Sequence, residues 1–487
     1  MASTHTFETQ VIEAVPKQLL IGGEWRDAAQ AGSLPVEDPS TGEVLCEAAD
    51  AGPDDALAAL DAAAGAQAEW AAHPPRERGE ILRRAFEALV ERTDELAMLM
   101  TLEMGKPVAE SKAEIAYAAE FFRWFAEQAV RIDGRYAVNA NGQGRTLVMH
   151  QPVGPCLLIT PWNFPMAMGT RKIGPAIAAG CTMVAKPASL TPLSMLALAE
   201  ILGEAGLPDG VLNIVTSSRS GSVMGPLIED PRTRKLSFTG STEVGRKLMA
   251  QASEQVLRVS MELGGNAPFL VFDDADVDDA VQGAMIAKMR NVGEACTSAN
   301  RFHVAESIAG EFTQKLADRM ASLKVGRGTE EGVEVGPLVD DDQRSKVAEL
   351  VDDAVGKGAT VVVGGSARQG SGYFYDPTVL GDVPDEARLL REEIFGPVAP
   401  IKGFGSEEEA IAAANDTEYG LVAYVYTSNL ARAFRVIEAL ETGMVGLNQG
   451  MVSNAAAPFG GVKSSGVGRE GGHEGINEYL ETKYVAM

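Results

Sequence analysis

From residue 155 onward, short apolar runs alternate with segments of helical periodicity, and this alternation constrains the fold more than any other feature of the chain. We predict strands at 156–160, 181–187, 211–216, 234–240 and 257–265, and helices at 171–180, 191–206 and 242–254. Strands that alternate with helical crossovers of about 10 to 15 residues favour a parallel sheet with helices on both faces. Ligands of such sheets bind beyond the carboxyl ends of the strands, so the residues directly after each strand are candidates for a binding site.

A second alternating block follows and predicts a second α/β unit. We expect its strands at 267–274, 301–306, 358–365 and 443–450, and its helices at 278–291 and 308–325. Amphipathic helices should precede the first block, at 54–72, 76–105 and 111–132.

Segment 134–154 has two β-prone runs around the turn-forming "NANGQG", which predicts a hairpin, and 476–487 ends the chain with another β-prone run. An isolated hairpin is only marginally stable in water, so it should lie against another domain or another subunit.

Composition excludes several classes of function. The 42 Lys and Arg against 68 Asp and Glu give a net charge of −26, and no basic cluster is present, which argues against nucleic acid as a partner. The four cysteines have no CxxC spacing and the five histidines form no metal motif, so we expect no zinc site and no disulfide framework, as in a reducing cytoplasm. We see no signal peptide and no apolar run of about 18 residues, so no membrane span is expected.

Three stretches place reactive or charged side chains at or near predicted strand ends. Cys296 lies among small polar residues in "GEACTSAN", whereas Cys156 and Cys181 lie in apolar strands and should only pack. Glu262 in "SMELGG" could serve as a general base or as a solvated rim carboxylate. Lys186 in "AKPAS" is either an ordinary surface lysine or a cation for an anionic ligand.

The Gly-rich "FTGSTEVG", residues 238–245, would present backbone N–H groups at a helix N-terminus, which suits a phosphate. It matches neither the P-loop nor the GxGxxG pattern, so it stays a candidate nucleotide site.

Seven motifs in this order resemble the NAD(P)-dependent aldehyde dehydrogenase superfamily. They are "TPWNFP", "KPAS", "FTGSTEVG", "MELGGNAP", "GEAC", "EEIFGP" and "APFGGVKSSGVGRE", and the resemblance runs from "LLIGGEWRD" to the C-terminal strand. Within the superfamily the chain looks closest to the succinate-semialdehyde dehydrogenases. The resemblance implies a Rossmann-type parallel-sheet cofactor domain, an α/β catalytic domain and a small β oligomerisation element.

The resemblance implies covalent catalysis. Cys296 matches the cysteine whose thiolate attacks the aldehyde, and Asn163 matches the amide that, with the cysteine backbone N–H, stabilises the oxyanion. Glu262 matches the base that activates water to hydrolyse the thioester, so a free acid should be released.

The resemblance also implies a dinucleotide cofactor. Its expected binding residues are Thr160, Pro161, Trp162, Lys186, Ala188, Ser189, Gly240, Ser241, Leu263, Glu393 and Phe395. Many NAD-preferring members carry Glu where this chain has Ser189, and that carboxylate would repel a 2′-phosphate, whereas Ser189 with Lys186 can accommodate one. We therefore expect NADP, with NAD as the alternative.

For the substrate, Arg171, Arg290 and Ser453 match positions that hold a distal carboxylate in succinate-semialdehyde dehydrogenases. The expected reaction is oxidation of succinate semialdehyde to succinate, and the alternatives are another carboxylated semialdehyde, such as glutarate semialdehyde, or a small hydroxyaldehyde.

Two positions depart from the family. Ser298 replaces the second cysteine of a regulatory disulfide, and Glu294 replaces a common Gln and adds a negative charge near the site.

We expect a dinucleotide-binding domain of residues 1–130 and 153–262 and a catalytic domain of residues 263–453. Segments 131–152 and 470–487 resemble the family's oligomerisation element, so a homodimer or homotetramer is expected. A catalytically silent protein with the same fold is the competing hypothesis, and the intact set of Cys296, Glu262 and Asn163 argues against it.

Overall fold

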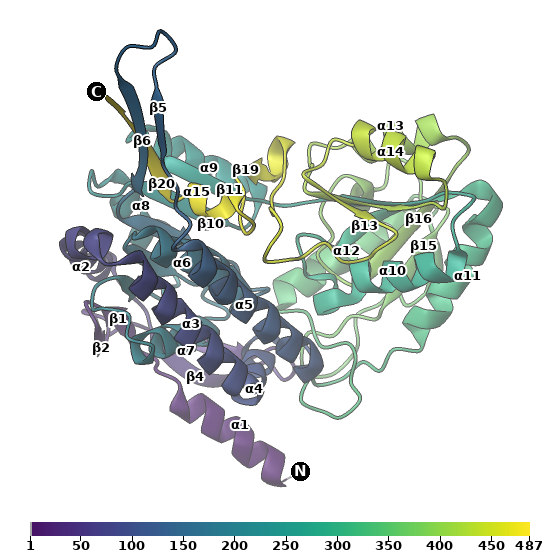
Figure 1. Ribbon diagram of the computed structural model, residues 1–487. Helices are drawn as coiled ribbons and strands as arrows, with labels where there is room; N and C mark the ends of the chain where they lie inside the picture. Colours follow the sequence, from purple (N-terminus) through teal and green to yellow (C-terminus); the bar gives the residue numbers. More distant parts are fainter. Residues whose placement is uncertain (1) are drawn as a thin grey trace.

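The computed structural model of the chain describes residues 2–487, with side chains from residue 6 onward. Two lobes lie side by side, and a β-hairpin projects from the first of them near the C-terminus (Figure 1). The first lobe contains an eight-stranded sheet and the second a seven-stranded sheet.

The strands of the first sheet follow the order β19-β11-β10-β7-β8-β9-β1-β2. The five central strands, from β11 to β9, run parallel, and the outer strands are antiparallel to their neighbours. The bounds are β19 (Gly466–Val467), β11 (Arg258–Glu262), β10 (Lys235–Thr239), β7 (Cys156–Ile159), β8 (Met183–Lys186), β9 (Leu212–Ile214), β1 (Leu19–Ile21) and β2 (Glu24–Arg26). The predicted parallel sheet is confirmed.

Helices cover both faces of this sheet. Along β7, Leu158 packs into a core that contains α3 to α7, whereas its neighbour Leu157 packs into a core that contains α2, α8 and α9. Successive strand residues point to opposite faces, so a strand buried on both sides is apolar throughout. The helices of this lobe are α1 (Ala2–Ala14), α2 (Pro53–Ala72), α3 (Pro75–Glu91), α4 (Thr93–Met104), α5 (Val108–Gln128), α6 (Ala167–Ala179), α7 (Leu193–Glu204), α8 (Ser220–Glu229), α9 (Thr242–Ser253) and α15 (Glu474–Asn477).

The second sheet has the order β14-β15-β16-β13-β12-β17-β18 and is parallel except for β14. Its strands are β14 (Thr360–Val363), β15 (Thr378–Gly381), β16 (Val398–Phe404), β13 (Ala299–Ala305), β12 (Ala267–Val271), β17 (Val422–Tyr426) and β18 (Met444–Leu447). The helices α10 (Val277–Met289), α11 (Glu306–Ala321) and α12 (Asp341–Gly356) cover one face, and α13 (Glu407–Asn415) and α14 (Leu430–Ala439) cover the other. The second predicted α/β unit is therefore confirmed.

The predicted hairpin is formed by β5 (Arg135–Val138) and β6 (Arg145–Pro152), and β20 (Leu480–Ala486), the predicted terminal strand, pairs with β6 along its whole length. A smaller antiparallel pair joins β3 (Ser33–Asp38) and β4 (Glu43–Ala49). The sheet of β5, β6 and β20 thus joins segments that lie more than 300 residues apart in the sequence.

Some elements differ from the prediction. The helix expected at 76–105 is two helices that meet at Arg92, where ψ is 17°. Helix α8 was not predicted, because Pro226 and two glycines obscure its periodicity. Strands β1 to β4 and β15 to β17 and helices α1 and α12 to α14 were also not predicted. Among the described residues, no helix is both long and apolar enough to span a bilayer.

Candidate active site

A cavity of about 210 Å³ lies at the carboxyl ends of β7, β10 and β11, where the parallel sheet was expected to bind a ligand. Predicted site residues on its wall are Pro161, Trp162, Asn163, Gly240, Ser241, Glu262, Leu263, Cys296, Glu393 and Phe395. The structure thus brings together side chains from both lobes. Lining residues that the sequence reasoning missed are Phe164, Met168, Thr239, Gly264, Gln343 and Lys346.

A second cavity, of about 440 Å³, adjoins the first at Phe164, which lines both. Its wall includes Arg290, Met289 and Met451, together with charged residues of the α4–α5 region such as Lys106.

Cys296 is carried into the first cavity by an unusual turn. After α10, a short 3-10 helix (Arg290–Gly293) contains three consecutive residues with positive φ: 52° at Asn291, 57° at Val292 and 80° at Gly293. A Cβ atom at Gly293 would clash with the carbonyl oxygen of Gly396, so only glycine fits there. Left-handed backbone at non-glycine residues is strained and concentrates at functional sites.

The Cys296 thiol is partly buried, and charged neighbours act on its pKa. Burial raises its pKa to about 12, Arg171 and Arg290 act to lower it, and Glu393 and Glu262 act to raise it. A thiol with such a pKa is almost entirely protonated at neutral pH, so it needs a base or a bound cation to react.

Asn163 is held firmly at the cavity. Lys106 Nζ donates to its carbonyl oxygen at 2.8 Å, and Asn291 Nδ2 donates to the same oxygen at 3.0 Å. Its side-chain Nδ2 donates to the carbonyl oxygen of Glu294 at 2.9 Å. An amide nitrogen carries two N–H groups, so one remains for an oxyanion.

Glu262 ends β11 and is 3% exposed, with Oε2 lacking a hydrogen-bond partner among the described residues. Burial and the charge of Glu470 raise its pKa well above the usual range. Glu470 forms ion pairs with Lys172 at 2.5 Å and Arg171 at 3.4 Å. Burial opposes ionisation of Glu470, but these two cations outweigh it and lower its pKa.

The remaining residues predicted to bind the cofactor lie at the end of β8 or in the turns after β7 and β8. The Thr160 backbone N–H donates to the carbonyl oxygen of Lys186 at 3.2 Å, so the two turns are neighbours. Lys186 is 3% exposed, and burial lowers its pKa to about 8, with Asp50 acting in the opposite direction. Ala188 and Ser189 follow it and are partly exposed. A buried lysine is therefore available for an anionic group.

At the other side of the cavity, residues after β15 complete the wall. Glu393 accepts a hydrogen bond from the Gly265 backbone N–H at 3.0 Å, and burial raises its pKa to about 7. The Phe395 ring packs edge-on against Trp162, with 5.4 Å between ring centroids. Gln343 Nε2 donates to the Phe395 carbonyl oxygen at 2.7 Å. Ser241 caps α9, so the N-terminus of that helix faces the cavity.

The two predicted substrate arginines meet at Tyr117. The Arg171 guanidinium lies 5.9 Å from the Tyr117 ring centroid and the Arg290 guanidinium 5.7 Å from it. Arg290 also donates to Ser453 Oγ at 3.0 Å. Arg171 lines neither cavity, is 2% exposed and already has the carboxylate of Glu470 as a partner, whereas Arg290 lines the second cavity.

Glu294 does not add charge to the cavity, in contrast to the expectation from sequence. Its side chain is fully buried and lines neither cavity. It accepts a hydrogen bond from the Val339 backbone N–H at 3.1 Å. Ser298 lies next to Lys288, whose carbonyl oxygen accepts from Ser298 Oγ at 3.5 Å.

The sequence model described as "Aldehyde dehydrogenase family" matches residues 25–485. A succinate-semialdehyde dehydrogenase of Paenarthrobacter nicotinovorans is 59% identical over 91% of this chain and 99% of its own length. A succinate-semialdehyde dehydrogenase [NADP(+)] of Escherichia coli strain K12 is 52% identical over 97% of this chain and 98% of its own. A glutarate-semialdehyde dehydrogenase of Pseudomonas putida KT2440 is also 52% identical, with the same coverage.

Solved structures share the architecture. A crystal structure of an E. coli NADP-dependent enzyme superposes with a TM-score of 0.96 and 52% identity, covering 97% of this chain and 98% of its own. Betaine aldehyde dehydrogenase from Staphylococcus aureus, in complex with NAD+, has a TM-score of 0.96 and 33% identity, covering 99% and 97% of the two chains.

Proposed function

Because this chain belongs to the aldehyde dehydrogenase family, we propose that it oxidises succinate semialdehyde to succinate with NADP, by covalent catalysis on Cys296. The observation that carries the proposal is one cavity whose wall includes Cys296, Glu262 and Asn163. Relatives at 59% and 52% identity are named for this substrate, and one of them for NADP.

The residues present fit a dinucleotide. The N-terminus of α9, capped by Ser241, and the buried cation Lys186 suit phosphate groups, and the carboxylate of Glu393 suits a ribose. When bound, NADP supplies the hydride acceptor for the oxidation. Ser189 leaves room for a 2′-phosphate, and NAD is the alternative because a relative of the same fold was solved with NAD+.

In the first step, the Cys296 thiol loses its proton to solvent, and the thiolate sulfur forms a bond to the aldehyde carbon as the carbonyl π electrons move onto oxygen. Asn163 Nδ2 and the Cys296 backbone N–H stabilise that oxyanion. The oxyanion then re-forms its C=O bond as hydride leaves the carbon, which gives a thioester on Cys296.

In the second step, Glu262 removes a proton from water, whose oxygen attacks the thioester carbon. The C–S bond breaks, the carboxylic acid departs and the thiolate regains a proton. The raised pKa of Glu262 suits this role, because its ionised form accepts a proton more readily than an ordinary carboxylate does.

The distal carboxylate of the substrate would bind at Arg290, with Arg171 and Ser453 nearby. Arg290 is partly exposed and lines the second cavity, which supports direct contact. Arg171 would act mainly through its charge, since Glu470 already pairs with it. Glutarate semialdehyde is the second candidate substrate, because a 52% identical relative is named for it.

The test is a matrix of aldehydes and cofactors. The value of kcat/KM should be highest for succinate semialdehyde with NADP, lower for glutarate semialdehyde and much lower for butanal, which lacks the carboxylate. Highest kcat/KM with butanal would refute the carboxylate site, and a strong preference for NAD would refute the role given to Ser189. No turnover with any aldehyde would favour the catalytically silent alternative.

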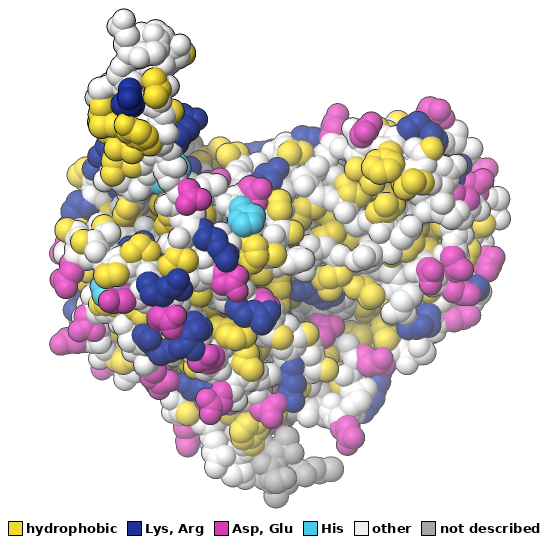
Figure 2. Space-filling model, in the orientation of Figure 1, with side chains coloured by type: hydrophobic (Ala, Val, Ile, Leu, Met, Phe, Trp, Pro, Cys, Tyr) yellow, Lys and Arg dark blue, Asp and Glu magenta, His cyan; other side chains and the backbone are white. Residues whose placement is uncertain are grey.

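Domain division and assembly are part of the same proposal. Residues 1–130 with 153–262 would bind the cofactor, and 263–453 would carry the nucleophile. A homodimer or homotetramer is supported by exposed apolar side chains on the projecting sheet, such as Tyr136 at 64% and Tyr484 at 62% exposure. Figure 2 shows hydrophobic surface gathered on this projection. Light scattering should give a mass of at least twice that of the chain. We also propose a cytoplasmic location.

A further inference from the structure

Glu294 is a buried acid that the proposed mechanism does not use. It lies two residues before the nucleophile, it is 0% exposed, and it lines neither of the two cavities. Its Oε1 accepts the Val339 backbone N–H at 3.1 Å, and its Oε2 has no hydrogen-bond partner among the described residues. The side chain therefore points away from the reacting atoms, toward the segment that leads into α12.

That segment carries part of the cavity wall. Val339 precedes Asp340, the N-cap of α12, and the first turns of α12 place Gln343 and Lys346 on the wall. Gln343 in turn donates to the carbonyl oxygens of Ile394 and Phe395. The single contact between Glu294 and Val339 thus joins the nucleophile loop to the side of the cavity assigned to the cofactor.

The backbone of Glu294 makes the complementary connection. Its carbonyl oxygen accepts hydrogen bonds from Asn163 Nδ2 and from Asn291 Nδ2, each at 2.9 Å. The first of these fixes the orientation of the amide proposed to hold the oxyanion. The second stabilises the left-handed turn that brings Cys296 into the cavity. A shift of residue 294 would therefore move the nucleophile and release the oxyanion donor together.

Burial disfavours the ionised form of Glu294. Burial raises its pKa well above the usual range, Asp340 acts in the same direction, and the hydrogen bond from Val339 and the charge of Lys106 oppose them. Asp340 and Lys106 are the charged groups that face it. A neutral carboxylic acid accepts the Val339 N–H as well as a glutamine amide would, without a buried charge.

Resting on the proposed function of the site, we infer that Glu294 is a positioning residue: in its neutral form it holds the Cys296 loop against the α12 segment and thereby aligns the nucleophile with Asn163. It does not contact the substrate. Its side-chain volume and one acceptor oxygen are what the reaction needs, and its charge is not.

Two variants separate these properties. Glu294→Gln keeps an oxygen that can accept the Val339 N–H. Glu294→Met keeps the side-chain volume but has no such oxygen. We expect kcat of Glu294→Gln within about twofold of wild type at pH 7, and kcat of Glu294→Met lower by about 10- to 100-fold with KM nearly unchanged, because misplacement by about an ångström has such effects. Glu408→Gln, at an exposed glutamate of α13, is the matched control and should behave as wild type.

A second measurement does not need turnover. The rate at which iodoacetamide alkylates Cys296, followed by intact mass, should change in Glu294→Met and stay near wild type in Glu294→Gln. If wild type oxidises no aldehyde, the proposed function fails, yet this rate still tests the positioning role.

Thermal stability gives a third test. A carboxyl group whose folded pKa is raised stabilises the fold fully below its unfolded pKa, and this contribution is lost as the pH rises through the folded pKa. The melting temperature of Glu294→Gln minus that of wild type should therefore increase from pH 5 to pH 9. This comparison decides the question even where Glu294→Met does not fold.

Three results would overturn the inference. Equal losses of kcat in Glu294→Gln and Glu294→Met would mean that the acid itself transfers a proton. Wild-type kcat and alkylation rate in Glu294→Met would mean that the contact with Val339 positions nothing. A lower KM for succinate semialdehyde in Glu294→Gln, with a melting-temperature difference that does not vary with pH, would mean that Glu294 is ionised and acts on the substrate.

Discussion

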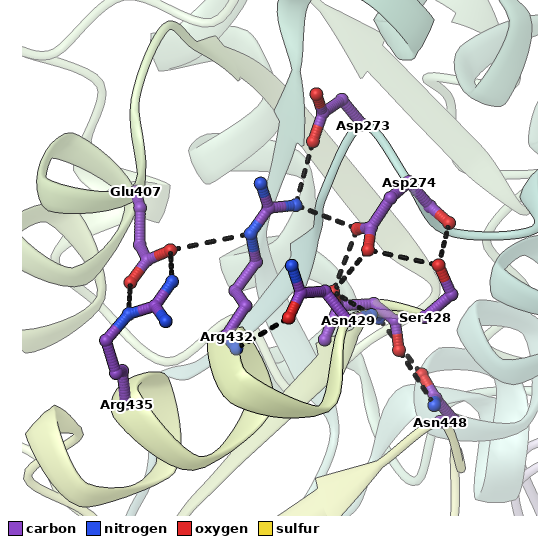
Figure 3. Close-up of polar contacts among 9 residues, drawn as sticks. Asp273, Asp274, Glu407, Ser428, Asn429, Arg432, Arg435 and Asn448 are labelled. Carbon is purple, nitrogen blue, oxygen red and sulfur yellow. Dashed lines mark hydrogen bonds and ion pairs between the residues drawn. The ribbon is translucent and has the colours of Figure 1, made fainter.

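Acidic side chains at the cavity and around Arg432 have opposite surroundings. In the second lobe, Arg432 forms ion pairs with Asp273 and Asp274, both at 2.8 Å, and with Glu407 at 3.4 Å (Figure 3). Asp274 also accepts hydrogen bonds from Thr427 and Ser428. At the cavity, Glu262 is buried with an unpartnered oxygen.

The two settings shift pKa values in opposite directions. Partial burial of Asp274 favours its neutral form, but hydrogen bonds and the charge of Arg432 outweigh it and lower the pKa. Burial dominates at Glu262 and raises the pKa. The carboxylate of Asp274 thus links a loop to the N-terminus of α14. The carboxyl group of Glu262, with its raised pKa, is instead suited to exchange a proton.

Among the changes predicted for the cavity and for the Arg432 network, removal of the nucleophile should have the largest effect. Cys296→Ala should lower kcat by about 10⁴-fold or more, because covalent catalysis has no substitute thiol in the cavity. The assay is reduction of NADP followed by absorbance. Cys46→Ala, at a partly buried thiol of β4, should retain wild-type turnover, and substantial turnover by Cys296→Ala would contradict the covalent mechanism.

Replacing the unpartnered acid should have the next largest effect. Glu262→Gln should slow steady-state turnover by about 10²- to 10⁴-fold, because hydrolysis of the thioester loses its base. A rapid burst of reduced cofactor close to one equivalent per site should remain, and intact mass should show the acyl group on the protein. Asp274→Asn is the control and should turn over normally; a Glu262→Gln enzyme without a burst would show that this residue acts earlier.

The pH dependence follows from the raised pKa values. Thiolate at Cys296 and carboxylate at Glu262 both increase as the pH rises, so kcat/KM should rise from pH 6 to pH 9, by up to about tenfold per unit. Initial rates at saturating cofactor measure this. A rate that falls over this interval would mean that neither group limits the reaction in the form described.

The smallest predicted effect is on stability, where the contributions of Asp274 and Glu262 should depend on pH in opposite directions. Asp274→Asn should lower the free energy of unfolding by about 1–2 kcal/mol at pH 7, as expected for a partly buried network of hydrogen bonds and ion pairs. Since the Asp274 pKa is lowered in the fold, its contribution is present above the unfolded value of 3.8 and is lost as the pH falls through the folded value. Denaturant titrations at pH 7 and at a pH well below 3.8 should show the deficit shrinking.

For Glu262 the sign reverses. Its folded pKa is raised, so its favourable contribution is lost as the pH rises, and Glu262→Gln should match or exceed wild-type stability at pH 8. If both variants destabilise equally at every pH, the contrast between the two regions is wrong.

Much of the fold could be predicted because its signals are local. The apolar strand at 156–159 is buried on both faces, and a run without polar alternation indicates this directly. The hairpin could be predicted from the turn-forming residues between its two β-prone runs. Helix α8 and strand β16 were not predicted because glycine and proline interrupt their periodicity. Strand β17, with the sequence VAYVY, has a clear β-strand pattern and was missed all the same.

The residues of the site could be named from motifs, but not their partners. Arg171 looks like a free cation in the sequence, yet Glu470, 299 residues away, pairs with it. Glu294 looks like a charge beside the nucleophile, yet its side chain is directed to Val339 and buried. Gln343 and Lys346 lie in an ordinary amphipathic helix and gave no signal.

The sequence by itself determined the two alternating α/β blocks, the hairpin, the nucleophile Cys296 as a candidate and the turn residues after each strand, since periodicity, glycine positions and motif order are properties of neighbouring residues. Only the tertiary structure decided which acid has a raised pKa, which arginine is already paired and which glutamate is turned away from the cavity. These depend on burial and on charges contributed by residues hundreds of positions apart, because electrostatic energy follows distance in space and local dielectric rather than distance along the chain.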